Sequence, residues 1–203
     1  MIKFFRQKNR GFTLVETMVA ISIFTMSVLS VLVVLSSGIS NTTYAKNKII
    51  AQYLGQEGVE YMRNMRDTFL LYTNLTNEPS NPNGWDAFRK KLITAACDQA
   101  NGCYLDDQSL DYTAGADRPM AKTLSLITCS TGTCPALKYN SANGRYNYAT
   151  GTNTNFIRTV KIQCPNNDCT TGDEIKISVD VSWVQGSGTF HNAFSENLFN
   201  WIQ

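Results

Sequence analysis

The feature that most constrains this chain is an uncharged, mainly apolar run of nineteen residues from Thr17 to Leu35. As an α-helix rising about 1.5 Å per residue, this run spans roughly 28 Å, close to the thickness of a bilayer core. A secretory signal peptide has a shorter apolar region followed by a small-x-small cleavage site, and no such site is evident here. The run therefore predicts a membrane-spanning helix that stays in the mature protein.

Charge is distributed unevenly around this run. The whole chain carries a net charge of +2, and its first eleven residues carry +4 from Lys3, Arg6, Lys8 and Arg10, which leaves −2 for the remainder. A basic flank favours the cytoplasmic side of a membrane, so we expect a single-pass membrane protein with the rest of the chain outside the cytoplasm. The slightly acidic remainder argues against nucleic acid as a partner.

Glu16 is the unusual residue at the start of the apolar run. A carboxylate inside an apolar span costs on the order of 3 kcal/mol on insertion scales, so such a residue usually has a function and a partner. If the chain is cut after Gly11, a new α-amine forms at Phe12, and Glu16 can pair with the Phe12 amine of a neighbouring subunit. The alternative is an interfacial glutamate at the edge of an ordinary signal anchor. We favour the functional interpretation because the basic leader, Gly11, Phe12 and Glu16 occur together.

The segment from Lys8 to Glu16 resembles the cleavage region of type IV prepilins and type II secretion pseudopilins. In that family a membrane aspartyl peptidase cuts after the glycine and N-methylates the new first residue. The resemblance implies cleavage between Gly11 and Phe12, N-methylation of Phe12, and a role for Glu16 in filament assembly. It also implies prepilin peptidase, other pilin subunits and, before assembly, the inner membrane as partners. The sequence itself has one histidine, no Gly-x-Ser-x-Gly motif and no phosphate loop, so we expect no catalytic residue, cofactor or metal.

Similarity to one branch of that family extends further along the chain. Residues 16–24 look closer to PilV-type minor pilins and to the minor pseudopilin of the I class than to major pilins, and residues 52–67 again resemble PilV-type proteins. The resemblance implies a type IV pilin fold and a final place in an extracellular pilus or a periplasmic pseudopilus.

Beyond Gly38 the composition becomes polar, but the pattern remains helical. Gly58 lies on the apolar face of this part and would allow a sheet to approach closely. Turn-forming residues 77–84 end any helix, so we expect one long helix from Phe12 to about Leu70. The apolar positions recur at steps of four and seven: Ile50, Leu54, Tyr61, Met65 and Phe69. These patterns divide the chain into a leader, a membrane or filament-core helix, an amphipathic helix and a head: residues 1–11, 12–38, 39–72 and 73–203.

The first part of the head predicts a short amphipathic helix that ends at Cys97, because one of its faces carries Trp85, Phe88, Leu92 and Ala96.

The C-terminal part of the head predicts antiparallel strands. Residues 156–162 have apolar side chains at 156, 160 and 162, and residues 175–183 alternate without a break, with the odd positions inward. One long helix followed mainly by strands indicates an α+β fold in which the amphipathic helix packs on the sheet. The expected core consists of Phe156, Val160, Ile162, Ile175, Ile177, Val179, Val181 and Trp183, packed on the Ile50–Phe69 face.

Six cysteines lie in the C-terminal half in three closely spaced pairs. An even number in local pairs, after an N-terminal apolar segment, indicates disulfides in an oxidising compartment. Zinc is the alternative, but it prefers shorter C-x-x-C knuckles, and the only histidine, His191, belongs to no histidine motif. Six cysteines allow about fifteen pairings. Sequence proximity favours the pairs Cys97–Cys103, Cys129–Cys134 and Cys164–Cys169.

Two other groups of residues carry weaker indications. Asp106, Asp107 and Asp111 suggest calcium, but their spacing matches no EF-hand, and a solvated acidic turn is the better interpretation. A second group combines aromatic residues, which could stack on the bases of DNA, with basic residues, which could contact its phosphates. These residues are Tyr139, Tyr146 and Tyr148 near Lys138 and Arg145. The net negative charge of the mature chain argues against DNA binding.

The sequence thus predicts a non-enzymatic structural subunit, a minor pilin of a type IV pilus. A minor pseudopilin of a type II secretion system is an alternative of the same class. A single-span membrane protein with a ligand-binding head is an alternative of another class. Glu16 argues against the last, because a simple anchor gains nothing from an intramembrane carboxylate.

Overall fold

The computed structural model describes residues 11–72, 84–106, 114–115, 118–119, 125–130, 132–165 and 168–201. The chain divides into two compact units, Met1–Lys46 and Asn47–Gln203. Helix α1 (Leu14–Tyr72) contributes its first part to one unit and its last part to the other. The helix predicted from Phe12 to about Leu70 is therefore confirmed to within two residues at each end.

The first unit contains the apolar part of α1. Thr13 is its N-cap, because its Oγ1 accepts a hydrogen bond from the Glu16 N–H at 3.2 Å. Hydroxyl groups farther along donate hydrogen bonds to backbone carbonyls three or four residues earlier, so the polar side chains of the span are hydrogen-bonded within the helix itself. These hydroxyls belong to Thr17, Ser22, Thr25, Ser27 and Ser30.

The second unit combines the last part of α1 with a short helix, α2 (Gly84–Thr94), and two antiparallel sheets. The larger sheet has seven strands: β1 (Cys103–Asp106), β4 (Ser125–Thr128), β5 (Ala136–Asn140), β6 (Arg145–Asn147), β7 (Thr152–Gln163), β8 (Glu174–Gln185) and β9 (Gly188–Phe199). The smaller sheet pairs β2 (Ala114–Gly115) with β3 (Arg118–Pro119). This arrangement confirms the expected α+β architecture.

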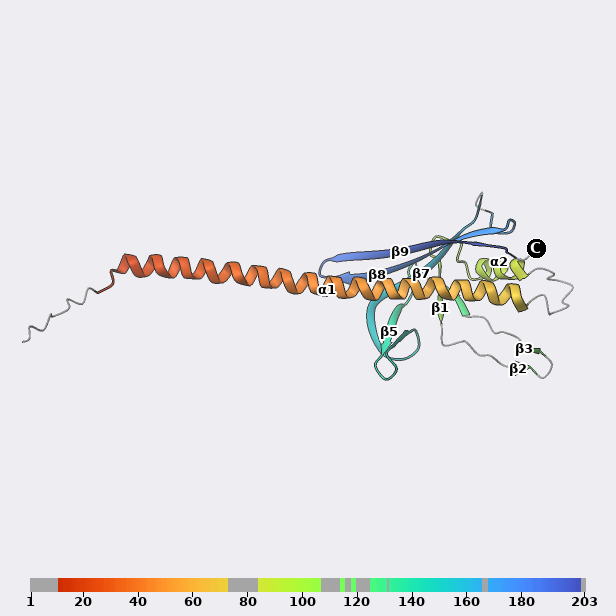
Figure 1. Ribbon diagram of the computed structural model, residues 1–203, viewed down its shortest axis with the longest axis horizontal. Helices are drawn as coiled ribbons and strands as arrows, with labels where there is room; N and C mark the ends of the chain where they lie inside the picture. The colour runs from red at the N-terminus through yellow and green to blue at the C-terminus, as the bar shows by residue number, and fades with distance from the viewer. Residues whose placement is uncertain are drawn as a thin grey trace, which may run out of the picture. The chain divides into compact units, whose positions relative to one another are not determined.

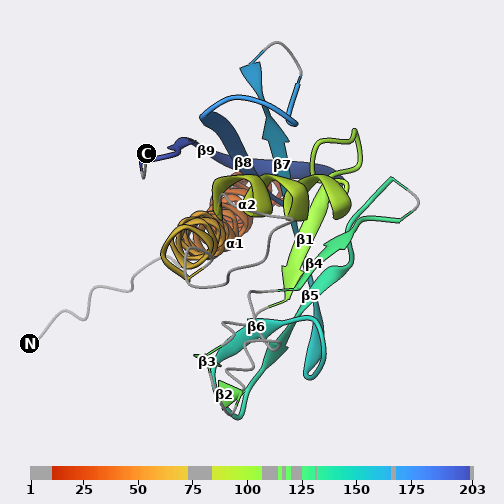
Figure 2. The ribbon, with the colours of Figure 1, turned by 90° about the vertical axis from the view of Figure 1, so that its right-hand side faces the viewer.

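Strand β7 lies at the centre of the larger sheet. It pairs with β8 along one edge and with β1 and β5 along the other, and β9 continues the sheet beyond β8. Viewed along α1, strands β7 to β9 and strands β5 and β6 lie on different sides of the helix (Figure 2). Every residue of the predicted strand core is buried: Phe156, Val160, Ile162, Ile175, Ile177, Val179, Val181 and Trp183.

The last part of α1 lies along β7, β8 and β9 (Figure 1), and two glycines set how closely it approaches them. A Cβ atom on Gly58 would lie 2.8 Å from the Val179 Cγ1, and one on Gly55 would lie 2.5 Å from the Phe194 ring. The close approach expected at Gly58 is therefore confirmed. The most buried line of the helix runs through Ala51, Leu54, Gly55, Gly58, Met62 and Met65.

The predicted apolar face of this helix is only partly correct. Leu54 and Met65 are buried, but Ile50, Tyr61 and Phe69 are only half-buried at the edges of the contact. The pattern included Gly58 but not Gly55, and at these two glycines the backbone of the helix itself lies against the sheet.

Helix α2 ends at Thr94, three residues before the predicted end at Cys97. Ala96 has a φ of 54°, and the Cys97 N–H donates to the Leu92 carbonyl at 3.1 Å, which is the pattern of a Schellman C-cap with alanine in the position usually held by glycine. The apolar face of α2 buries Trp85, Phe88 and Leu92, as the sequence indicates.

Candidate functional site

The first candidate site is the start of α1. Gly11 and Phe12 precede the helix and are exposed, and Glu16 lies exposed in its first turn. Glu16 is the only charged residue between Leu14 and Ala45. The basic residues predicted to form the rest of the leader lie outside the described residues.

An apolar surface surrounds Glu16 and continues along α1. Among the described residues, α1 is the one helix long and apolar enough to cross a membrane, with a mean hydropathy of 2.6 in its most apolar window. None of that window is buried within the chain. Since large exposed apolar surfaces mark interaction sites, the first unit requires a lipid or protein partner that the chain does not supply to itself.

Three disulfides hold the head: Cys97–Cys103, Cys129–Cys134 and Cys164–Cys169. They are the pairs that sequence proximity favours. All six cysteines are bonded, so none provides the thiolate that a zinc site needs. His191 is exposed and contacts Asp180 on the neighbouring strand, with 3.0 Å between Nδ1 and Oδ2.

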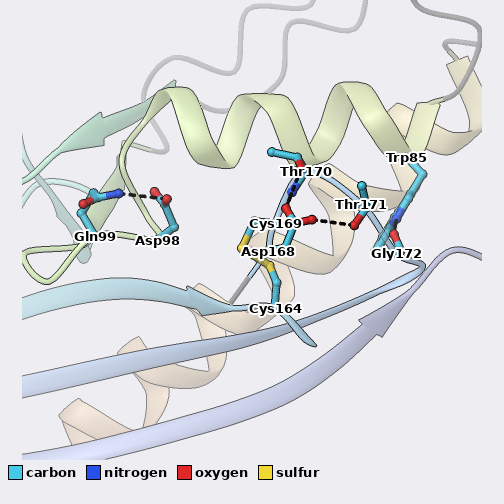
Figure 3. The surroundings of a disulfide bond; sticks show 9 residues. All are labelled: Trp85, Asp98, Gln99, Cys164, Asp168, Cys169, Thr170, Thr171 and Gly172. Carbon is cyan, nitrogen blue, oxygen red and sulfur yellow. Dashed lines mark hydrogen bonds between the residues drawn. A yellow bond between two sulfur atoms is a disulfide. The ribbon is translucent and has the colours of Figure 1, made fainter. Parts of the chain in front are cut away.

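Figure 3 shows the Cys164–Cys169 bond under α2, between the ends of β7 and β8. The Asp168 carboxylate accepts hydrogen bonds from the Thr170 and Thr171 hydroxyls, which lower the pKa of this exposed carboxyl. Trp85 donates from Nε1 to the Gly172 carbonyl at 2.8 Å and so ties the first turn of α2 to the same loop. These contacts give the loop a structural role in holding α2.

An ion pair that was not predicted joins α1 to the centre of the sheet. Arg158 points inward from β7 and is 1% exposed, and its guanidinium donates to the Glu57 carboxylate at 2.8 Å. The other Glu57 oxygen accepts from the Tyr61 hydroxyl at 3.3 Å. The alternation of β7 could have located this contact, because position 158 lies between the inward residues Phe156 and Val160.

A groove runs between α1 and the tip of the β5–β6 hairpin, and we call it the α1–hairpin groove. The tip is shaped by Gly144, whose φ is 71°, and by the Asn143 side chain, which accepts from the Arg145 N–H at 3.1 Å. The groove has a volume of about 480 Å³. Its walls come from Ile50, Tyr53, Leu54, Glu57 and Tyr61 of α1 and residues 144–146 of the hairpin.

Tyr146 forms the hairpin wall of this groove and is fixed by its neighbours. Its ring centroid lies 5.1 Å from that of Tyr139 and 6.1 Å from that of Phe156, which leads into the core at Trp183. Desolvation, with a smaller contribution from Tyr139, raises the pKa of the Tyr146 hydroxyl. The Tyr146 part of the hairpin wall is therefore an uncharged aromatic surface that packs against the core.

The three tyrosines considered for DNA do not share an open face. Tyr148 turns toward β1, where its ring centroid lies 4.7 Å from that of Tyr104, and burial raises the pKa of its hydroxyl. Tyr139 packs on Tyr146, so neither ring is free on both faces. Of the acidic group considered for calcium, Asp106 ends β1, and Asp107 and Asp111 lie outside the described residues.

Comparison with known protein families places a motif on the first of these sites. The model of the prokaryotic N-terminal methylation motif matches residues 6–32, a segment that contains Gly11, Phe12 and Glu16. The chain thus carries a prokaryotic N-terminal methylation motif, which is consistent with the type IV prepilin and pseudopilin family. Neither the comparison with curated proteins nor that with solved structures gives a match.

This motif implies processing by prepilin peptidase and assembly with other pilins. The motif and the single apolar helix that follows it fit a single-pass membrane anchor. The match covers the N-terminal segment alone, so the likeness to PilV-type proteins stays a prediction.

Proposed function

We propose that this chain is a minor pilin that prepilin peptidase cuts between Gly11 and Phe12 and N-methylates at Phe12, and that Glu16 directs its assembly into a type IV pilus-like filament. The observation that carries this proposal is the methylation motif at residues 6–32, which spans all three residues. The partners are prepilin peptidase and other pilin subunits.

The chemistry of Glu16 supports the assembly step. An unpaired carboxylate in an apolar span is costly, and the α-amine released at Phe12 is the charge that would compensate it. Thr13 caps the helix directly after Phe12, so a mature chain begins one residue before the cap. This short end keeps the Phe12 amine about one helical turn from Glu16 along the helix axis, so an axial offset of about one turn between neighbouring subunits would pair the two charges.

We assign a separate role to each of four consecutive segments of the chain. Residues 1–11 are the leader, residues 12–38 anchor the subunit in the inner membrane and then in the filament core, residues 39–72 pack on the head, and residues 73–203 form the head outside the cytoplasm. Three disulfides suit an oxidising compartment of this kind.

Cleavage is tested by mass spectrometry of the mature N-terminus from a host that contains prepilin peptidase. We expect a chain that begins with N-methylated Phe12. A mature chain that starts at another residue contradicts the cleavage site, and Gly11→Val, which removes the residue before the cut, serves as the uncleaved control.

Assembly is tested with Glu16→Val in the same host. We expect normal membrane insertion and cleavage, because valine suits the apolar span, but loss of the subunit from sheared surface filaments. Glu60→Val is the matched control, since Glu60 is an exposed glutamate in the same helix outside the motif. Wild-type amounts of the Glu16→Val chain in filaments would refute the proposal.

The sheared-filament and cell fractions from this experiment also distinguish a minor pilin of a pilus from a minor pseudopilin of a type II secretion system. A minor pilin is recovered with sheared surface filaments, and its deletion leaves type II secretion intact. A minor pseudopilin stays in the periplasm, and its deletion blocks the export of folded proteins.

A further inference from the structure

The direction of the α1–hairpin groove follows from the residues that line it. Its α1 wall begins at Ile50 and ends at Tyr61, with lining residues at steps of three and four, so the groove runs along one face of the helix. Eleven steps of about 1.5 Å from the first to the last of these residues give a length of about 16 Å, or three turns. The groove is therefore parallel to α1.

The groove is too shallow for a whole helix and suits one row of side chains. A volume of about 480 Å³ over about 16 Å corresponds to a mean cross-section of about 30 Å², whereas a helix with its side chains is about 10 Å wide. Three turns of a helix lying on this groove would insert three or four side chains from one ridge.

The lining calls for an apolar partner. Both oxygens of Glu57, the only carboxylate in the lining, are engaged by Arg158 and Tyr61, and Arg145 is an exposed residue of the lining. Tyr53 is 69% exposed, and the adjacent Ile49 is 52% exposed. Among residues 47–70 of α1, these are the large hydrophobic side chains that remain exposed.

The chain carries one element with the complementary surface, the apolar segment of α1 from Thr17 to Leu35. It is uncharged, its hydroxyls donate to its own backbone, and it finds no cover within the chain. An exposed apolar ridge follows steps of three and four along it: Ile21, Phe24, Val28, Leu32 and Leu35. In a filament, this segment of a neighbouring subunit is therefore the exposed apolar helix that is available to the groove.

We propose that the α1–hairpin groove is a docking site for the apolar helical segment of a neighbouring subunit that carries the same N-terminal methylation motif. The inference rests on the proposed function, because it takes the chain to be a filament subunit. It adds a contact between a head and a helix to the contact between Glu16 and the Phe12 amine. Tyr53 and Tyr146 form the two walls that hold the ridge.

The test places a photo-crosslinking residue, p-benzoylphenylalanine, at Tyr53 of the full chain in a host that makes filaments. Phe199 is the matched control, because it is an aromatic residue of the same head, 51% exposed, on β9 and outside the groove. After irradiation of sheared filaments, mass spectrometry of crosslinked peptides identifies what lies in the groove. We expect Tyr53 to give peptides from the uncharged span that follows a mature N-terminal Phe, and Phe199 to give none of these.

Crosslinks from Tyr53 solely to the head of a neighbour, to a peptide from a protein without the motif, or to lipid would overturn the proposal, as would filaments that contain the chain but show no crosslink. The amount of chain in the sheared fraction is measured first. Its absence there refutes the proposed function, whereas its presence without the expected crosslink refutes the groove contact alone.

A charge variant gives a second measure. Tyr53→Lys places an ammonium at an exposed position, so the head stays folded, but the groove no longer suits an uncharged helix. We expect the ratio of filament-bound to membrane-bound subunit to fall about fivefold, the size of effect that a residue central to an interface has, while prepilin cleavage stays normal. Phe199→Lys should leave this ratio unchanged, and equal ratios for both variants would contradict the groove contact.

Discussion

The two compact units use the same kinds of side chain in opposite ways. Val28, Leu32 and Leu35 of the first unit are all exposed, whereas Val160 and Val179 of the head are completely buried. Residue type is therefore no guide to burial without a partner surface. The head supplies its own partner, a sheet that packs on the last part of α1, and the first unit depends on lipid or on other subunits.

Two glycines of α1 show the same difference between an exposed unit and a packed one. Nothing lies within 4 Å of a Cβ built on Gly38, whereas a Cβ on Gly58 meets Val179 at 2.8 Å. One glycine occupies open space and the other makes helix-to-sheet packing possible. Substitutions at buried positions of the head should thus lower the free energy of unfolding of the head. Equivalent substitutions in the first unit should leave that free energy unchanged.

The largest expected effect comes from Trp183→Ala. Trp183 is 1% exposed and lies between Phe156 and Phe190, so truncation leaves a cavity in the head and should lower the free energy of unfolding by about 3–5 kcal/mol. Trp201→Ala, at an exposed tryptophan, is the control and should be nearly neutral. Denaturant unfolding of a soluble piece from residue 47 to 203 measures both, and a nearly neutral Trp183→Ala would show that the core is elsewhere.

A somewhat smaller effect is expected from Gly58→Ala. Its methyl group would press on the buried Val179 and on the Arg158 side chain, and overpacking of this kind costs about 1–3 kcal/mol. Gly38→Ala adds the same methyl group to the same helix in open space and should leave the unfolding of the head unchanged. Denaturation of the full chain in detergent, followed by tryptophan fluorescence, compares them, and equal effects would remove the distinction between the units.

The pair Cys164→Ser with Cys169→Ser should loosen one hairpin without unfolding the head. A bond between cysteines five positions apart closes a short loop, which on the chain-entropy model is worth about 2 kcal/mol. Hydrogen exchange should rise at the adjoining ends of β7 and β8 and stay low at Val179. An unfolded double variant would mean that the disulfide, and not the apolar core, holds the head.

Glu57→Ala should have the smallest effect, about 1 kcal/mol. It removes the carboxylate from buried Arg158, but the Glu57 side chain is 38% exposed, so solvent screens the pair, and Arg158 retains the Leu54 carbonyl at 3.4 Å. Glu57→Gln, which keeps an oxygen acceptor, should lose less. The unfolding midpoints of the two variants check this, and a loss as large as that of Trp183→Ala would mark the ion pair as central to the head.

The alternation of a strand and the spacing of a helix are patterns among residues close together in the sequence. The buried faces that depend on these patterns could therefore be predicted. The alternation of β7 and β8 located the inward side chains from Phe156 to Trp183, because the side chains of a strand point to alternate faces. The α2 face of Trp85, Phe88 and Leu92 follows from helical spacing in the same way. Position 158 fitted the alternation too, but an arginine gave no reason to place it in the core until Glu57 was found opposite.

The sequence by itself determined that the chain has an apolar span with one carboxylate, a basic end, a methylation motif and an α+β head, because these are properties of residues close together in the chain. Only the tertiary structure decided which face of α1 meets the sheet, that Arg158 is buried against Glu57, and that Tyr53 and Tyr146 form two walls of one groove. The physical reason is distance along the chain: these pairs lie about a hundred residues apart, and packing between α1 and the sheet brings them together. Local patterns carry no information about such contacts.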